Sequence, residues 1–259
     1  MPALSRYVAA MVTIDSDPRG AVRELFYAGL ASVPGADPAY EARRHGGRHA
    51  VTRDPTMLVV DGYPGSGNSW ATRIVEIAGG WERPVAHHRH RPAQIIEGVR
   101  RRLPTLLVVR EPLDAIASKV VRHGGNPRVE LRRYDYFHAR CWRVAERAEV
   151  ITFAQATTDG GSIVMRLNAR FDCRLTPLAD LADDAEKQIL GSLDWNAKLA
   201  HGAEAGLHSP TPSADRSEHL AAVREQLLDP RDAAALARCR RQYDRYAEVA
   251  ARQAATAAG

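Results

Sequence analysis

The most constraining feature of this chain is a glycine-rich turn between an apolar run and a segment of helical character. Residues 57–60 are all apolar and include two valines, which suits a short buried strand. Residues 69–78 can form a helix, which Gly79 and Gly80 would end. A strand, a glycine turn and a helix N-terminus direct backbone N–H groups and the positive end of the helix dipole at one point. The stretch therefore predicts a site for a phosphate or a similar anion.

The residue types in the turn narrow the choice of ligand. Gly62 to Ser69 fits the G-x-x-x-x-G-x-S form of a phosphate-binding loop (P-loop), but Asn68 stands where nucleotide triphosphatases have a lysine. That lysine neutralises the β- and γ-phosphates, and asparagine carries no charge to do so. The alternative is an ordinary strand-to-helix connection.

Residues 63–70 read Tyr-Pro-x-Ser-Gly-x-Ser-Trp, which resembles the donor-phosphate loop of the sulfotransferases that use 3'-phosphoadenosine 5'-phosphosulfate (PAPS). The resemblance implies that the backbone of residues 66–69 and two serine hydroxyls hold the 5'-phosphosulfate, with the tryptophan against the adenine. The donor-binding residues that it carries over from this loop are Tyr63, Pro64, Gly65, Ser66, Gly67, Asn68, Ser69 and Trp70. Many family members have lysine or arginine at the position of Gly65, where it steadies the bridging oxygen. Gly65 cannot do this, so either another basic residue takes that role here or the rate of transfer suffers.

A second motif follows the clearest apolar run of the chain, residues 105–109. Arg110 would lie at the carboxyl end of that strand, where open parallel sheets collect ligands. Ser118 follows eight residues later, two turns into the next helix. This step resembles the sulfotransferase motif for the donor's 3'-phosphate, because arginine grips two phosphate oxygens and serine donates one more hydrogen bond. The alternative is that Arg110 pairs with a nearby carboxylate.

A later segment, residues 209–216, resembles the part of some family members that folds over the nucleotide. The resemblance makes Ser213 and Arg216 candidates for contact with the donor phosphates. The alternative for Ser213 is a helix N-cap.

Histidines follow the short predicted strand 85–87, at the place where sulfotransferases resemble one another in having a catalytic histidine. A base must remove the proton of the acceptor hydroxyl, and the pKa of histidine suits that role. The H-x-H-x-P form from His88 to Pro92 fits best, so His88 is the first choice as base and His90 the second. The alternatives are a basic surface loop and a metal site, for which no acidic or cysteine partner is placed.

Composition limits the setting of the protein. The 259 residues allow one sizeable domain, and the net charge of +5 suits an anionic ligand, nucleic acid or an anionic membrane surface. Nothing in the sequence has the spacing typical of nucleic-acid modules, and no apolar run is long enough to span a bilayer. The three cysteines, Cys141, Cys173 and Cys239, show neither metal nor disulfide spacing, which with the lack of a signal peptide predicts a cytoplasmic protein without a metal.

Strand-like and helix-like segments alternate along the chain. We therefore expect an α/β fold of the P-loop type: a mainly parallel sheet flanked by helices, with a helical C-terminal third. One domain would cover residues 1–259, with an N-terminal extension over 1–55 and a core over 57–250. We also expect a long helix over 128–148, a strand over 150–154, a turn over 157–161 and helices over 162–169, 214–228 and 231–251.

The leading hypothesis is a sulfotransferase that moves the sulfuryl group of PAPS to a hydroxyl of a small-molecule, carbohydrate or lipid acceptor. The transfer would be in line, with a histidine base and no metal, by analogy with phosphoryl transfer. Two alternatives remain at this point: a P-loop kinase of nucleotides or small molecules, which Asn68 disfavours, and a non-catalytic binder of the same nucleotide. No motif identifies the acceptor.

Overall fold

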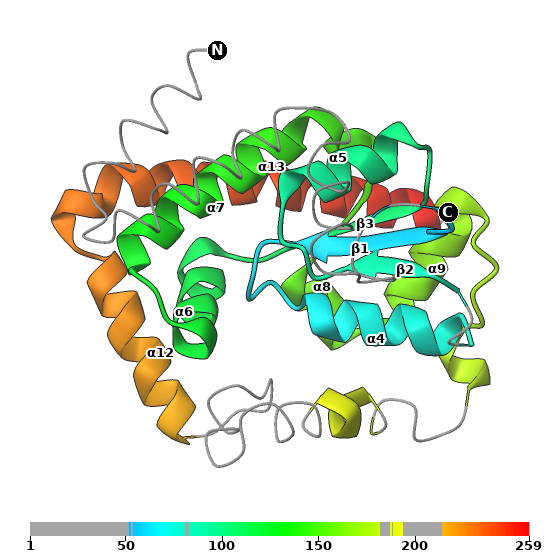
Figure 1. The fold of residues 1–259 in the computed structure, drawn as a ribbon, viewed down its shortest axis with the longest axis horizontal. Helices are drawn as coiled ribbons and strands as arrows, with labels where there is room; N and C mark the ends of the chain where they lie inside the picture. The colour runs from blue at the N-terminus through cyan, green and yellow to red at the C-terminus, as the bar shows by residue number, and fades with distance from the viewer. Residues whose placement is uncertain are drawn as a thin grey trace.

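The computed structural model describes residues 52, 54–80, 83–181, 187, 189–193 and 214–258. Most of the predicted N-terminal extension lies outside these residues, as does Ser213. The described part forms four parallel strands in the order β2-β1-β3-β4, covered by helices on both faces (Figure 1). The strands are β1 (Leu58–Gly62), β2 (Val85–His87), β3 (Thr105–Val109) and β4 (Glu149–Thr152).

Helices follow each strand, which confirms the predicted α/β class with a parallel sheet and a helical C-terminal region. The α-helices between the strands are α4 (Asn68–Ala78), α5 (Pro92–Arg100), α6 (Pro112–His123) and α7 (Pro127–Cys141). Those after β4 are α8 (Phe153–Thr158), α9 (Gly160–Phe171), α12 (Ala214–Leu227) and α13 (Ala233–Ala258). Short 3₁₀-helices are η1 (Trp142–Arg147), η2 (Leu178–Asp180) and η4 (Pro230–Asp232). No helix in the described ranges has the length and apolarity needed to cross a bilayer.

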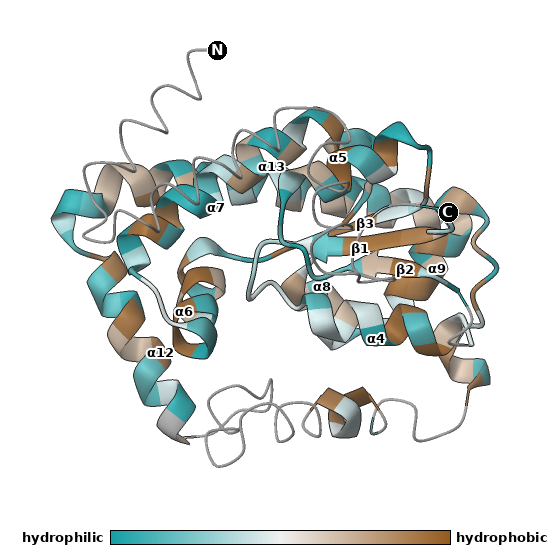
Figure 2. Ribbon diagram, viewed as in Figure 1, coloured by the Kyte–Doolittle hydropathy of each residue, from teal (hydrophilic) through white to brown (hydrophobic). Residues whose placement is uncertain are grey.

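The strands are buried on both faces because successive side chains point to opposite sides of the sheet. Val59 and Leu107 belong to the core beneath α5, α7 and α13. Val60 and Leu106 belong to the core beneath α4 and α9. The strands are correspondingly apolar along most of their length (Figure 2). This explains why β1 and β3 read as continuous apolar runs rather than as alternating sequences.

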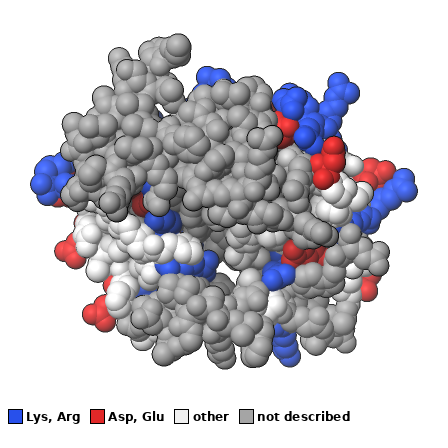
Figure 3. All heavy atoms as spheres, viewed as in Figure 1, with Lys and Arg blue, Asp and Glu red and all other residues white. Residues whose placement is uncertain are grey.

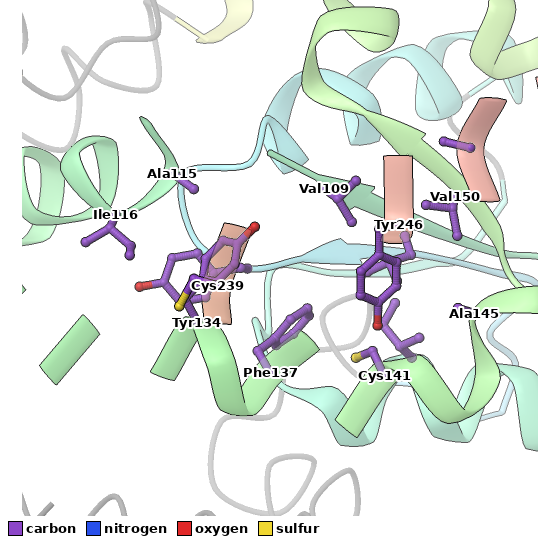
Figure 4. Packing of buried hydrophobic residues seen from close by; sticks show 14 of the residues in the cluster. Val109, Ala115, Ile116, Tyr134, Phe137, Cys141, Ala145, Val150, Cys239 and Tyr246 are labelled. Atoms are coloured by element: carbon purple, nitrogen blue, oxygen red, sulfur yellow. The ribbon is translucent and has the colours of Figure 1, made fainter. Parts of the chain in front are cut away.

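The larger core lies where α7 and α13 meet the sheet (Figure 4). The predicted apolar stripe of α7 contributes Tyr134, Phe137 and Cys141, all at most 2% exposed. Cys239 and Tyr246 of α13 pack against them. The Tyr246 hydroxyl donates to the carbonyl oxygen of His138 at 2.7 Å. The C-terminal helix is therefore part of the domain core.

His138 lies within this core, fully buried on α7, and it gives a pH-dependent stability. Burial lowers its pKa to about 4, although Nδ1 donates to the carbonyl oxygen of Tyr134 at 2.9 Å. Below a pH of about 6.5, the imidazole of His138 binds a proton in the unfolded chain but stays neutral in the folded chain. We expect this residue to cost about 2 kcal/mol of stability between about pH 7 and pH 5.

Urea unfolding of the wild type and His138→Phe at those two pH values measures this contribution. In His138→Phe, the free energy of unfolding should fall by about 2 kcal/mol less between pH 7 and pH 5 than in the wild type. An equal slope in both proteins would contradict it.

Three predicted boundaries differ from the structure. The strand predicted to end at Ala154 ends at Thr152, because Thr152 and Gln155 form a capping box that begins α8 at Phe153. The predicted turn over 157–161 is mostly helical, since Asp159 accepts a hydrogen bond from the Ser162 N–H and so begins α9 at Gly160. The predicted helix over 128–148 is α-helical to Cys141 and then tightens into η1.

Charged side chains are spread around the face shown in Figure 3, with Lys and Arg interspersed among Asp and Glu. Many of the described arginines form ion pairs, such as Arg128 with Asp229 and Asp232.

Arg110, which follows β3, also lies close to other arginines. Besides burial, the charges of Arg224 and Arg216 on α12 lower its pKa. Its own charge in turn adds to burial in lowering the pKa of Arg122 on α6. These four residues are called the arginine group below.

Candidate functional site

The predicted site residues meet at the carboxyl edge of the sheet. β1 leads into the glycine-rich turn, β2 into the histidines, β3 into Arg110 and β4 into Phe153. α4 covers one face of the sheet and α5 the other, so the chain switches faces beside β1 (Figure 1). A strand order of 2-1-3-4 has its switch point between β1 and β3, where ligands bind in open α/β sheets.

The turn over residues 63–67 is shaped as an anion cradle. Gly65 and Gly67 have φ angles of 81° and 94°, which the absence of a side chain permits. Gly67 is the N-cap of α4, so no side chain caps the helix, and its first turn has no acidic residue. The first N–H groups of a helix have no partner within it. The Ser66 hydroxyl is fully buried and has no hydrogen-bond partner among the described residues.

Gly65 also explains why this loop lacks a basic side chain. A Cβ atom at this position would lie 2.4 Å from the carbonyl oxygen of Ala115 and 3.1 Å from the Cβ of Ser118. The turn therefore packs directly against α6, and there is no room for a lysine or arginine at residue 65. A basic group at the site must come from another element.

We expect Gly65→Ala to lower the free energy of unfolding by about 2 kcal/mol or more, because a positive φ and a backbone clash add. Gly80→Ala is the matched control, since Gly80 has a φ of 71° with nothing within 4 Å of its Cβ position. Urea unfolding should show a distinctly larger loss for residue 65. Equal losses would mean that the packing of the turn on α6 contributes nothing.

Arg110 joins the turn to the end of β3. Its Nη1 donates to the carbonyl oxygen of Gly65 at 3.0 Å, and its guanidinium lies 3.9 Å above the centre of the Phe153 ring. The Tyr134 hydroxyl donates to the Arg110 carbonyl oxygen at 2.6 Å. Burial lowers the pKa of Arg110, and nearby arginine charges lower it further against the opposing effect of Asp114. The side chain stays charged because arginine has so high an ordinary pKa.

Ser118 and Arg216 also meet at this edge. The Ser118 hydroxyl accepts a hydrogen bond from Arg216 Nη2 at 3.1 Å, and both residues are at most 7% exposed. Their helices, α6 and α12, pack together. Asp114, one turn before Ser118, accepts two hydrogen bonds from Arg224 and lies 3.9 Å from Arg110. Sequence spacing paired Arg110 with Ser118, and the resemblance of residues 209–216 added Arg216, which contacts Ser118 in the structure.

Arg122 adds a further positive charge that the sequence did not indicate. It follows Asp114 and Ser118 at helical intervals of four residues, on the same face of α6. Its Nε is buried without a hydrogen-bond partner among the described residues. Burial, followed by the charge of Arg110, lowers its pKa. Arg122 in turn contributes to the lowered pKa of His88, so its charge acts on both sides of the site.

His88 is enclosed by other polar groups. Its Nε2 lies 2.9 Å from the Ser69 hydroxyl oxygen, and its Nδ1 lies 2.7 Å from Nδ1 of His87. Burial lowers its pKa to about 3, with further contributions from His90 and His87. Both ring nitrogens are thus occupied, and the Ser69 hydroxyl is engaged with this ring.

His90 has one ring nitrogen engaged and one available. Its Nδ1 lies 2.9 Å from the carbonyl oxygen of Gly62 and 3.2 Å from Oδ1 of Asp61. The Asn68 amide nitrogen also lies 3.4 Å from Nδ1, but it donates to the carbonyl oxygens of Tyr63 at 2.9 Å and Gly62 at 3.3 Å. The two closer atoms are acceptors, so Nδ1 carries the hydrogen and donates. Nε2 has no hydrogen-bond partner among the described residues, and the side chain is 25% exposed. In this tautomer Nε2 has a lone pair with which to accept a proton.

Two residues of the predicted loop turn their side chains away from the cradle. The Tyr63 ring packs edge-on against Tyr134 and Phe137, and its hydroxyl donates to Oε2 of Glu130 at 2.8 Å. The Trp70 indole N–H donates to the carbonyl oxygen of Ala156 at 2.9 Å. The Asn68 amide donates to the carbonyl oxygen of Tyr63 at 2.9 Å and so braces the turn.

Asp61 and Phe153 are site residues that the sequence reasoning missed. Each comes at the carboxyl end of a strand, which is the signal that identified Arg110. Asp61 was not predicted because it directly precedes the glycine-rich turn and was counted with it. Phe153 was not predicted because it and its apolar neighbours were assigned to the strand over 150–154. Among the described residues, no group of three His, Cys, Asp or Glu side chains could hold a metal ion.

In a comparison with known proteins, no protein-family model and no curated protein matches this chain.

Proposed function

We propose that this protein is a PAPS-dependent sulfotransferase that transfers a sulfuryl group to a hydroxyl acceptor. The observation that carries the proposal is the contact between Arg110 and the carbonyl oxygen of Gly65. It brings an arginine at the end of β3 against an anion cradle at the end of β1. A nucleotide with phosphates on both its 3' and 5' oxygens needs two such grips close together. The closeness of Arg110 to the other three residues of the arginine group, whose like charges repel one another, supports a ligand with several negative charges.

The residues that would hold the donor fall into two groups. The free N–H groups at the start of α4 and the buried Ser66 hydroxyl would bind the 5'-phosphosulfate. Arg110, Ser118 and Arg216 would bind the 3'-phosphate. Arg122 is our candidate for the basic group that Gly65 cannot supply. The donor, when bound, supplies the sulfuryl group that is transferred.

His90 is our candidate for the base. Its Nε2 would take the proton of the acceptor hydroxyl, because Nδ1 already carries a hydrogen and faces two acceptors. The contacts favour it over His88, whose two ring nitrogens are both engaged and whose pKa is held at about 3.

The three cysteines are buried thiols without disulfides, which supports our proposal of a reducing, cytoplasmic setting.

The test is binding and turnover with defined nucleotides. Calorimetry should show binding of adenosine 3',5'-bisphosphate, and incubation with PAPS and a panel of phenols and alcohols should release that bisphosphate. Absence of bisphosphate binding would overturn the proposal. Binding without transfer to any acceptor would instead identify a non-catalytic nucleotide binder, and magnesium-dependent ATP turnover would identify a kinase.

A further inference from the structure

The segment from His88 to His90 has an unusual backbone. Both histidines have a φ of 55°, in the left-handed region that residues with side chains rarely adopt. Arg89 separates them, so two of three successive residues are strained. Such strain persists only where the surrounding structure holds the backbone in place. The contacts that hold this segment therefore matter for the position of both imidazole rings.

The Asp61 carboxylate supplies these contacts. Its Oδ2 accepts hydrogen bonds from the backbone N–H groups of Arg89 at 3.0 Å and His90 at 2.9 Å. The Gln94 side chain donates to the same oxygen at 3.1 Å. Its Oδ1 accepts from the Gly62 N–H at 2.9 Å and lies 3.2 Å from Nδ1 of His90. One carboxylate thus contacts both the backbone and the ring of His90.

Asp61 is fully buried at the end of β1, yet it is ionised at neutral pH. Burial by itself would raise its pKa, but the interaction with His90 and the hydrogen bond from Gly62 hold the pKa below its usual value. A carboxylate is an acceptor only. It therefore requires a hydrogen on the His90 nitrogen that faces it.

We infer that Asp61 is a positioning residue for the proposed base: it fixes His90 in the Nδ1–H tautomer, so that Nε2 is the nitrogen that accepts the proton. The catalytic role of His90 in this inference rests on the proposed function, whereas the tautomer that Asp61 favours does not depend on it. Partners behind a catalytic histidine commonly set which ring nitrogen carries the hydrogen. The role differs from mere support of a loop. An amide whose oxygen takes the place of Oδ2 would keep the hydrogen bonds from the Arg89 and His90 N–H groups, but it would turn an NH₂ donor toward Nδ1 of His90 in place of Oδ1.

The experiment compares Asp61→Asn with Glu149→Gln in the full chain. Glu149 is the matched control, because it is also a buried carboxylate on a strand, paired with Arg166 at 2.6 Å, but it lies at the start of β4. Side-chain ¹⁵N NMR, with the His90 signals assigned from His90→Ala, reports which nitrogen carries the hydrogen. We expect Nδ1–H in the wild type and in Glu149→Gln, and a shift toward Nε2–H in Asp61→Asn.

Kinetics give the second measurement. Asp61→Asn should lower kcat about 10- to 100-fold with KM for the donor and bisphosphate affinity within about 2-fold, as for other residues that orient a catalytic group. Glu149→Gln should keep kcat. An unchanged tautomer in Asp61→Asn, or equal losses of kcat and bisphosphate binding, would overturn the inference. Should Asp61→Asn not fold, an Nε2–H tautomer in the wild type still overturns it. A wild type that transfers no sulfate counts against the proposed function, whereas the tautomer tests Asp61 separately.

Discussion

Replacing His90 with alanine is expected to lower kcat about 10²–10⁴-fold, the contribution of a positioned general base. Affinity for adenosine 3',5'-bisphosphate should change by less than about 3-fold, because the donor grips lie on other elements. The reason is the geometry of the ring: Nδ1 faces the Gly62 carbonyl oxygen and Asp61, which leaves Nε2 available for the acceptor proton. The measurement is initial velocity with saturating PAPS, together with calorimetry of bisphosphate binding.

His88→Ala is the matched control, because it removes a neighbouring imidazole with both nitrogens already engaged. We expect less than about a 10-fold loss of kcat, since His88 supports the Ser69 hydroxyl rather than accepts a proton. Added imidazole should restore part of the activity of His90→Ala and none of that lost in His88→Ala. The opposite pattern would assign the base to His88, which was the first choice on sequence grounds.

The ordering of these two histidines shows where sequence reasoning stops. The H-x-H-x-P pattern predicted that both histidines lie at the carboxyl edge of the sheet. This was possible because the residues of β2 and the prolines around it indicate a short strand there. Alternation along an extended segment then placed both rings on one side. The segment is not extended, since both residues have positive φ. The Asp61 carboxylate accepts hydrogen bonds from the backbone of this segment, although Asp61 lies 27 residues before His88 in the sequence and meets the segment only in the folded sheet.

Elements with a local cause were predicted well. The strands β1 and β3 are apolar runs bounded by glycine or proline, and α5 and α6 begin with a proline at the first helical position. The end of β4 was misplaced because Phe153 and Ala154 are as apolar as the strand, while the capping box that begins α8 involves side chains. Short-range sequence patterns thus predicted most helices and strands. The misplaced boundaries lie where two such patterns overlap.

Contacts between distant residues account for what the sequence left open. The P-loop pattern identified the turn, but the absence of a basic residue at Gly65 had no explanation until α6 was seen to fill that space. Tyr63 matched the family pattern, yet its partner Glu130 is 67 residues away, on α7. Such pairs depend on how helices pack on the sheet, and no periodicity in the sequence encodes them.

Arg110→Ala is expected to weaken the binding of adenosine 3',5'-bisphosphate at least about 100-fold, because two charge-assisted hydrogen bonds to a phosphate contribute about 3 kcal/mol or more. The Arg110 guanidinium is fixed in advance by the Gly65 carbonyl oxygen and the Phe153 ring, so it loses little freedom on binding. Calorimetry measures the affinity. Arg224→Ala is the matched control, because Arg224 also lies near Arg110 but pairs with Asp114 through two hydrogen bonds. This substitution should weaken binding by less than about 5-fold.

The choice of ligand separates two ways in which Arg110 could act. Arg110 contacts the turn as well as the proposed 3'-phosphate position, so its removal could weaken binding through either. Adenosine 5'-phosphate lacks the 3'-phosphate and reports on the turn alone. If Arg110 binds the 3'-phosphate, the wild type prefers the bisphosphate strongly and Arg110→Ala loses that preference, because the monophosphate never used the guanidinium. If both nucleotides weaken equally, Arg110 acts by holding the turn, and the second anion grip on which the sulfotransferase proposal depends does not exist.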